Sequence, residues 1–429
     1  MADVFVIHGG KELSGEIKIH GSKNATLPIL AASLLNQGTT RLRNCAMIQD
    51  VFKLADIMRA MGASVVIDEP AHEITVDASG VKLLESNEAV DALVRKLRGS
   101  VLLIGSLLAR FGSLRIAMPG GDAIGARPLD PLFNGLRNLG VELEQKGDEQ
   151  ELRAPSAMHG AKIVLKETSV IATETLLIAA CGAMGQTTIK LAATEPHVQD
   201  VGGFLRKLGV VIDGLGTSTI SVQGVSATAI KKDVEYIVIP DSDEAMNLAV
   251  LCAATRSEVL ISQINPDFIE AGILQMQTMG VNIEVGDTWI KLHKPADAYQ
   301  AAKIQCGLYP KLMSDQVPPF AVLATQAQGV SMIQEWMYEG RLGYVNELIK
   351  MGANAIIMDP HRALIVGPTA LAGAQLKSLD IRAGMTMIIA GLVAPGETVI
   401  SDAHIIDRGF EHIDERLRAV GADIKRVDQ

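Results

Sequence analysis

Hydrophobic and polar positions along the chain repeat with a period of roughly 70 residues, which is typical of a protein built from copies of one supersecondary unit. Each copy ends a helical segment with an apolar residue followed by glycine, first at Met61-Gly62 and last at Val420-Gly421. The glycines of these phrases are Gly62, Gly140, Gly209, Gly280, Gly352 and Gly421. Six copies therefore account for nearly the whole chain.

Each copy contains two predicted helices with different hydrophobic patterns. The first is apolar on every face, which predicts a helix buried on all sides, and the second is amphipathic. Buried helices are expected at residues 24–35, 100–109, 172–183, 244–254, 319–327 and 383–394. Amphipathic helices are expected at residues 51–61, 132–139, 198–208, 269–279, 345–351 and 414–420. With the strand-like segments around them, each copy has the order β-α-β-α-β-β, which predicts α/β layers with parallel strands and crossover helices.

The grouping of the copies follows from their apolar helices. Three copies can close around three such helices, which predicts two similar domains. The polar segment Lys231-Lys232-Asp233 marks the boundary between them. At the N-terminus, β-branched segments at 4–8 and 16–20 flank Gly9-Gly10 and predict a hairpin.

Composition narrows the class of protein. The chain has 429 residues, of which 48% are hydrophobic and 21% charged, as in soluble globular proteins of two or three domains. A net charge of −10 argues against a nucleic-acid or anionic-membrane partner. No apolar run approaches the length of a membrane span and no signal peptide is visible, so a cytoplasmic location without membrane association is expected. The four cysteines (Cys45, Cys181, Cys252 and Cys306) lack metal-like spacing and are expected to be reduced and buried. No metal site and no obligatory protein partner are predicted.

Candidate chemistry gathers at the N-terminal ends of the buried helices. The polar residues there are, in chain order, Lys23, Asn24, Arg98, Thr168, Ser169, Asp241, Ser242, Asp243, Ser314, Asp315, Asp380 and Arg382. For Ser169, Asp241 and Asp243, capping of helix N–H groups is an equally good interpretation. Cations at this end oppose the helix dipole, so Lys23, Arg98 and Arg382 indicate a shared anion such as a phosphate.

Two loops add charged residues. The glycine-rich segment 119–128 carries one acid, Asp122, and one arginine, Arg127, although such a segment is often a plain turn. The segment 405–410 carries Asp407 and Arg408, which can equally be a helix cap and a solvated side chain.

Three motifs in this order resemble the signatures of the enolpyruvyl transferase family. They are Gly21-Ser22-Lys23-Asn24-Ala25, Pro119-Gly120-Gly121 with Ile124-Gly125-Ala126-Arg127-Pro128, and Ile406-Asp407-Arg408-Gly409. The resemblance extends from Gly9 to Val427. It implies an α/β protein with the inside-out α/β barrel fold, in which each of two domains holds three β-α-β-α-β-β repeats. It also implies that the N-terminal strands join the C-terminal domain, so the expected domains are 21–231, and 1–20 with 232–429.

The resemblance implies an enzyme that transfers the enolpyruvyl group of phosphoenolpyruvate to an acceptor hydroxyl and releases phosphate, without cofactor or metal. It is greatest to the members whose acceptor is the 3-hydroxyl of UDP-N-acetylglucosamine, at the first committed step of peptidoglycan biosynthesis. By the same resemblance, Lys23, Arg127 and Arg408 hold phosphoenolpyruvate, and Asp315 meets the acceptor hydroxyl as its base. The other substrate-side residues implied are Asn24, Arg98, Pro128, Leu129, Asp130, Pro131, Ser169, Met337, Arg341, Asp380 and Arg382.

The sequence departs from the family pattern in three places. Asp122 replaces the usual loop cysteine, so we expect Asp122 to be the general acid and the protein to be insensitive to fosfomycin-type epoxides. Ile171 replaces a common glycine in the stretch that contacts a diphosphate, with Glu167 nearby, which leaves a different acceptor open. The segment from Ser314 to Pro319 differs after the expected base, and its Pro pair is expected to shift the helix start. A nucleotide-sugar sensor without turnover is the non-enzymatic alternative.

Overall fold

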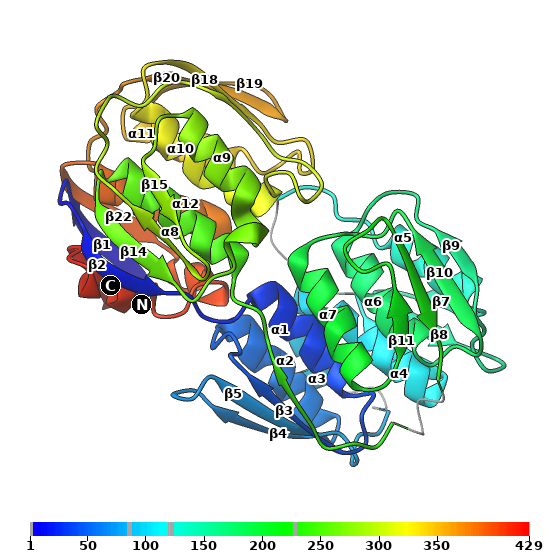
Figure 1. The fold of residues 1–429 in the computed structure, drawn as a ribbon. Coiled ribbons are helices and arrows are strands. Elements are labelled where there is room, and N and C mark those ends of the chain that lie inside the picture. The colour runs from blue at the N-terminus through cyan, green and yellow to red at the C-terminus, as the bar shows by residue number, and fades with distance from the viewer. Residues whose placement is uncertain (1–2, 84–87, 119, 121–123, 226–229, 429) are drawn as a thin grey trace. The chain divides into compact units, whose positions relative to one another are not determined.

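The computed structural model describes residues 3–83, 88–118, 120, 124–225 and 230–428 (Figure 1). Contacts divide these residues into two compact units. The N-terminal unit consists of the described residues between 21 and 120 and between 127 and 239, and the C-terminal unit of residues 3–20, 124–126 and 240–428. The contact boundary at Ile239 lies beyond the predicted one at Lys231, because β13 (Val234–Ile237) pairs with β3 (Thr39–Arg43) of the N-terminal unit.

Three apolar helices form the centre of the N-terminal unit: α1 (Lys23–Ser33), α4 (Leu103–Phe111) and α6 (Val170–Ala180), which pack on one another. Every residue from Ala25 to Ser33 in α1 is buried, as the all-apolar pattern predicted. The 3-10 helix η1 (Arg98–Leu102) precedes α4, so the α-helix begins later than expected. The other helices of this unit are α2 (Gln49–Ala60), α3 (Glu88–Arg95), α5 (Asp130–Asn138) and α7 (Pro196–Lys207).

Three sheets surround this core. Their strand orders are β13-β3-β5-β4, β6-β8-β7 and β9-β10-β12-β11. Besides β3 and β13, the strands are β4 (Ser64–Asp68), β5 (Glu73–Asp77), β6 (Ser113–Ala117), β7 (Glu142–Lys146), β8 (Glu149–Arg153), β9 (Lys162–Val164), β10 (Gln186–Lys190), β11 (Val211–Asp213) and β12 (Thr219–Gln223).

The C-terminal unit repeats this plan around α8 (Ser242–Ala254), α10 (Val317–Thr325) and α12 (Ile381–Val393). Its amphipathic helices are α9 (Glu270–Thr278), α11 (Gly343–Lys350) and α13 (Ile413–Ala419), with the 3-10 helices η3 (Pro266–Ile269), η4 (Ser314–Gln316) and η5 (Ala403–Arg408). The sheets have the orders β15-β16-β14-β2, β17-β18-β20-β19 and β21-β22-β1-β23. Their strands are β1 (Asp3–Gly9), β2 (Ser14–Lys18), β14 (Glu258–Ser262), β15 (Ile283–Val285), β16 (Trp289–Leu292), β17 (Lys303–Gln305), β18 (Gly329–Gln334), β19 (Asn354–Asp359), β20 (Arg362–Gly367), β21 (Gln375–Lys377), β22 (Gly396–Ser401) and β23 (Ile424–Asp428).

The sheets are mixed, which corrects the prediction of parallel layers. In the third repeat, β9 and β10 are parallel and are connected through the buried helix α6, as a crossover requires. The other pairs of that sheet, β10 with β12 and β12 with β11, are antiparallel. In this sheet, only the strand that leads into the buried helix runs parallel to the strand that follows it.

The predicted N-terminal hairpin is wrong. β1 pairs antiparallel with β22 and β23, whereas β2 pairs parallel with β14. The two strands thus complete two different sheets of the C-terminal unit. The β-branched pattern identified the strands but carried no information on their partners, because all three partner strands lie more than 200 residues away in the sequence.

The repeating glycines terminate helices as expected. All six have a positive φ, between 86° and 103°, in the region that residues with a Cβ rarely adopt. At Gly62, a Cβ would also lie 2.6 Å from the carbonyl oxygen of Gly80. The period in the sequence therefore reflects a backbone conformation that recurs once per repeat.

Two further expectations concern the cysteines and membrane-spanning helices. All four cysteines are free and buried, as predicted. Among the described residues, no helix combines the length and the apolar composition needed to cross a bilayer.

Candidate active site

Asp315 lies in η4, directly before the buried helix α10, between two arginines of the C-terminal unit. Its Oδ1 accepts a hydrogen bond from Arg341 Nη1 at 2.9 Å, and its Oδ2 accepts one from Arg382 Nε at 2.9 Å. Both arginines are buried, whereas the Asp315 side chain keeps 30% of its surface exposed. The carboxylate is thus held in one orientation with a face left accessible.

The pKa of Asp315 follows from these contacts. Burial raises this pKa, but the combined lowering by the guanidinium groups of Arg382 and Arg341 is larger than that increase. The pKa of Asp315 is therefore below the ordinary aspartate value. Asp315 is therefore ionised at neutral pH and accepts hydrogen bonds through both oxygens.

The start of α10 differs from the prediction. The helix begins at Val317, before the Pro pair rather than at its second proline. Proline is tolerated in the first helical turn because its missing N–H would have no partner inside the helix. The departure at Ser314–Pro319 therefore leaves Asp315 at the entrance of the helix.

Asp243 faces the same arginine from α8. Its Oδ2 accepts a hydrogen bond from Arg382 Nη2 at 3.2 Å, and its side chain is buried. The helix cap is Asp241 instead, which accepts a hydrogen bond from the N–H of Glu244 at 2.8 Å. Capping is thus the correct interpretation for Asp241 but not for Asp243, whose carboxylate accepts a hydrogen bond from Arg382.

The position of Arg382 is set by Asp380, the cap of α12. The Asp380 carboxylate accepts hydrogen bonds from the N–H groups of Arg382 at 2.8 Å and Ala383 at 3.1 Å. The Arg382 guanidinium also lies 5.4 Å from the centre of the Phe410 ring. A cation at this helix end is therefore stabilised by carboxylates and an aromatic ring, which offset the unfavourable helix dipole.

Glu335 supports this cluster, although no pattern in the sequence indicates it. Its fully buried carboxylate accepts hydrogen bonds from Ser314 Oγ at 2.6 Å and from the N–H of Met337 at 2.8 Å. Ser314 precedes Asp315, and Met337 is a predicted substrate-side residue that packs against the core. Glu335 thus links the segments that carry Asp315 and Met337.

In the N-terminal unit, Lys23 is the first residue of α1. Its Nζ lies 2.9 Å from Asp50 Oδ2, with only 12% and 4% of the two side chains exposed. Ser22 caps the helix by accepting a hydrogen bond from the N–H of Ala25 at 3.3 Å. Sequence reasoning missed Asp50, which lies in the first turn of α2.

Arg98 and Arg127, both predicted on the substrate side, are brought together. Arg98 Nη2 donates a hydrogen bond to the carbonyl oxygen of Arg127. After Arg127 the chain enters α5, with Leu129 and Pro131 buried, and Pro128 and Asp130 exposed. The predicted uridine-binding stretch is thus anchored at its apolar positions and exposes its polar ones.

The entrance of α6 combines a cap with a buried acid. Ser169 accepts a hydrogen bond from the N–H of Ala172 at 3.3 Å, as in the capping interpretation. One turn further on, Glu174 is 2% exposed, and burial, with a smaller effect of Glu195, raises its pKa well above the ordinary glutamate value. Sequence reasoning missed Glu174 because it lies within the predicted apolar helix 172–183.

The remaining predicted residues are distributed as follows. Asp122 lies outside the described residues, whereas the loop end beyond it packs on the C-terminal unit, where the N–H of Ala126 donates to the Glu339 carboxylate at 2.8 Å. Arg408, at the end of η5, and Asn24, in α1, are half-buried. Asp407 does not cap α13 but pairs with Arg426 at 2.6 Å. A meeting of Lys23, Arg127 and Arg408 around one anion stays a prediction.

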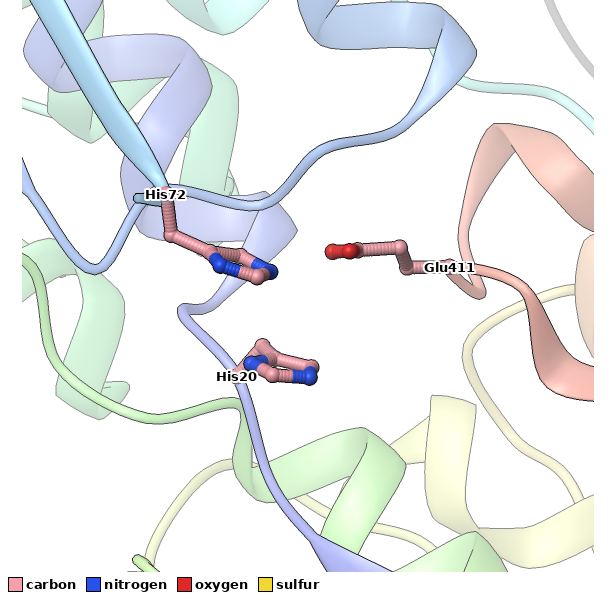
Figure 2. A group of neighbouring side chains, drawn as sticks. All are labelled: His20, His72 and Glu411. Carbon is pink, nitrogen blue, oxygen red and sulfur yellow. The ribbon is translucent and has the colours of Figure 1, made fainter. Parts of the chain in front are cut away.

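Figure 2 draws the side chains of His20, His72 and Glu411. His20 and Glu411 belong to the C-terminal unit, where their potential ligand atoms lie within 4.8 Å of each other, and His72 belongs to the N-terminal unit. Two ligands are fewer than the three or four that protein zinc sites use. The expectation that the enzyme works without metal stays a prediction.

The fold is matched by known proteins. The family model of EPSP synthase (3-phosphoshikimate 1-carboxyvinyltransferase) matches residues 7–417. The chain therefore belongs to the EPSP synthase family, and it is an enolpyruvyl transferase.

Individual members of the family show which enzymes this chain is similar to in sequence. The chain is 37% identical to the UDP-N-acetylglucosamine 1-carboxyvinyltransferase of Coxiella burnetii (strain RSA 493 / Nine Mile phase I) over 99% of this chain and 96% of that protein. It is 36% identical to the enzyme of the same name from Cellvibrio japonicus (strain Ueda107), over 99% of both chains.

Solved structures agree on the fold. The enolpyruvyl transferase NikO from Streptomyces tendae has a TM-score of 0.89 at 26% identity, covering 99% of both chains. EPSP synthase from Acinetobacter baumannii has a TM-score of 0.74 at 20% identity and covers both chains completely, which bears on the fold alone. The predicted fold class and the predicted enzyme class are confirmed.

Proposed function

We propose that this enzyme transfers the enolpyruvyl group of phosphoenolpyruvate to the 3-hydroxyl of UDP-N-acetylglucosamine and releases phosphate. The observation that carries the proposal is the carboxylate of Asp315, held between Arg341 and Arg382 and still accessible. Full-length similarity to enzymes named for this reaction supports the choice of acceptor. The pathway would then be peptidoglycan biosynthesis in the cytoplasm.

Asp315 is assigned to the acceptor hydroxyl. The hydroxyl oxygen forms a bond to the central carbon of phosphoenolpyruvate, and its proton passes to the Asp315 carboxylate. A low pKa makes Asp315 a weak base while both arginines are bound to it. An anion that attracts Arg341 and Arg382 weakens their hold on the carboxylate, which raises the pKa of Asp315 when the base is needed.

Asp122 is assigned as the general acid that protonates the methylene carbon in the same step. The product of addition is a tetrahedral ketal. Its C–O bond to phosphate then breaks, and a proton leaves the new methyl group to restore the double bond. The chemistry needs one proton donor near the methylene, and an aspartic acid supplies a proton as the cysteine of relatives does.

The cations are assigned to the charge of phosphoenolpyruvate. Lys23, Arg127 and Arg408 hold its phosphate and carboxylate, because fixed cations stabilise the charge that develops as phosphate leaves. The substrate-side residues Asn24, Arg98, Ser169, Met337, Asp380 and the stretch 128–131 orient the two substrates. The reaction as proposed needs no cofactor.

A different acceptor is the second candidate, and Glu174 favours it. A buried acid one turn below the entrance of α6, with Ile171 in place of the common glycine, alters the stretch expected to contact a diphosphate. An acceptor that lacks a diphosphate fits the altered stretch better.

Phosphate release decides between the candidates. The protein is incubated with phosphoenolpyruvate and, separately, UDP-N-acetylglucosamine, UMP or shikimate 3-phosphate, and released phosphate and product mass are measured. We expect turnover with UDP-N-acetylglucosamine at a kcat/KM well above that with the others. Turnover with UMP alone would replace the proposed acceptor, and binding without turnover for every acceptor would favour the sensor.

A further inference from the structure

Arg382 lies between two carboxylates that come from different helices. Its Nε donates to Asp315 at 2.9 Å and its Nη2 to Asp243 at 3.2 Å. Arg382 and Asp243 are 5% and 4% exposed. A charge in such a site is screened far less than one at the surface, so the protonation state of either acid changes what the guanidinium presents to a ligand.

Each element packed against Asp243 contributes to its environment. Asp315 and the Gln316 side chain come from η4, Arg382 from α12, and the cap Asp241 from its own helix. Burial has the largest effect and raises the pKa of Asp243. Arg382 lowers this pKa, whereas the charges of Asp315 and Asp241 raise it, and the net value is about 7. The pKa of Asp315, in contrast, lies below its ordinary value, so Asp315 keeps its charge throughout the neutral range.

The two states of Asp243 give Arg382 different charge balances. With Asp243 ionised, two carboxylates share the arginine and little positive potential remains for another anion. With Asp243 protonated, one of the two negative charges beside Arg382 is neutralised. The guanidinium can then attract a phosphate or carboxylate of the substrate. Ligand binding and loss of the Asp243 proton are therefore opposed, and each must weaken the other by the same factor.

We propose that Asp243 is a positioning residue that takes up a proton from solvent when phosphoenolpyruvate binds, and thereby couples the affinity for this anion to pH. The identity of the anion rests on the proposed function, whereas the coupling rests on the contacts of Arg382. No bond other than the O–H bond of Asp243 is made in this step. The proton comes from water or buffer and returns when the anion leaves.

Calorimetry tests the coupling directly. Phosphoenolpyruvate is titrated into the wild-type protein and into Asp243→Asn at pH 6.5, 7.5 and 8.5, in buffers of different ionisation enthalpy, and the protons taken up per site are derived. Asparagine keeps an oxygen for Arg382 but does not titrate, and the proton exchange of the substrate itself is the same in both titrations. We expect the wild-type to take up more protons than the variant, with the difference approaching one proton at pH 8.5.

The affinities give a second measurement. Above pH 7 the ratio of the wild-type Kd to the variant Kd is expected to rise by up to about tenfold per pH unit. Glu258→Gln, which removes an exposed acid paired with Lys291, serves as the control and should follow the wild-type. Equal proton uptake and a flat Kd ratio in the wild-type and Asp243→Asn would overturn the proposal. If Asp243→Asn does not fold, wild-type binding at pH 8.5 without proton uptake has the same consequence.

Turnover separates this proposal from the proposed function. Proton uptake on phosphoenolpyruvate binding, without turnover on UDP-N-acetylglucosamine, would contradict the assigned acceptor and leave the coupling in place. Turnover on that acceptor without proton uptake would contradict the coupling and leave the assigned reaction in place.

Discussion

Arg341 Nη1 donates a hydrogen bond to Asp315 Oδ1 at 2.9 Å, and the arginine that makes this contact is almost completely buried. The pair fixes one oxygen of the proposed base while Arg382 fixes the other. Such a carboxylate has little freedom to rotate, which favours an oriented hydrogen-bond acceptor for a substrate hydroxyl.

The first prediction is that Asp315→Asn loses catalysis and keeps its fold. An amide cannot take the hydroxyl proton, so kcat should fall by about 100-fold or more. Phosphate release measures the rate, and circular dichroism checks the fold. Asp359→Asn, which removes a half-buried acid paired with Arg362, should keep the wild-type rate. A kcat within threefold of wild type, on the order of 0.6 kcal/mol, would remove the base role from Asp315.

The second prediction concerns the ion pair of Lys23 with Asp50. Both side chains are largely buried, so Asp50→Asn leaves a cation without its charged partner and should cost about 3–5 kcal/mol of unfolding free energy. Asp56→Asn on the same helix breaks an exposed pair with Arg59 and should cost at most about 1 kcal/mol. Urea unfolding of the three proteins measures both values. Equal costs for the two variants would mean that solvent already screens Lys23.

The repeat was predictable because its signals are local. An inner helix that is apolar on every face can only be buried, and a glycine such as Gly62 supplies a positive φ that ends the next helix. Both features stand within a few residues of the element that they specify. The order of helices in each repeat followed directly from them.

Strand partners and ion-pair partners were not predictable in the same way. β13 pairs with β3 and β2 pairs with β14, although nothing in their β-branched patterns distinguishes one partner strand from another. Asp50 and Glu335 meet Lys23 and Ser314 only after the chain has folded. The sequence indicated Asp243 only in part. A helix start needs one capping side chain, here Asp241, so a second acid two residues later is not required as a cap.

The third prediction is that fosfomycin leaves the protein unmodified. The chain has four cysteines, all buried, and burial raises the pKa of their thiols, of Cys306 to about 12. Thiolates, which are the nucleophiles, are therefore scarce at neutral pH, and the loop position carries Asp122. Intact-mass spectrometry should show no adduct and phosphate release should be unchanged.

A matched variant tests the cause of that insensitivity. Asp122→Cys restores a thiol at the loop position and should become modified and inactivated. An adduct on the wild-type protein that disappears in Asp122→Ala would contradict the prediction and identify the carboxylate as the nucleophile.

The fourth prediction follows from the raised pKa of Glu174, whose cause is burial with a smaller effect of Glu195. The folded protein retains a proton on Glu174 at pH values where the unfolded chain has lost it. Stability contributed by this residue is therefore greatest below the unfolded pKa and falls as the pH rises toward the folded pKa. Glu174→Gln cannot titrate, so it should stabilise the protein relative to wild type at pH 8, by on the order of 1 kcal/mol more than at pH 5.

Unfolding in urea at the two pH values measures this difference. Glu167→Gln supplies the control, because Glu167 is exposed just before α6 and the same glutamate-to-glutamine change there alters no buried surface. We expect the Glu167→Gln difference to be the same at both pH values. If Glu174→Gln also shows no dependence on pH, then Glu174 keeps its charge in the folded state. A cation or water must in that case satisfy the carboxylate inside the N-terminal unit, because an isolated ionised carboxylate is too costly to bury.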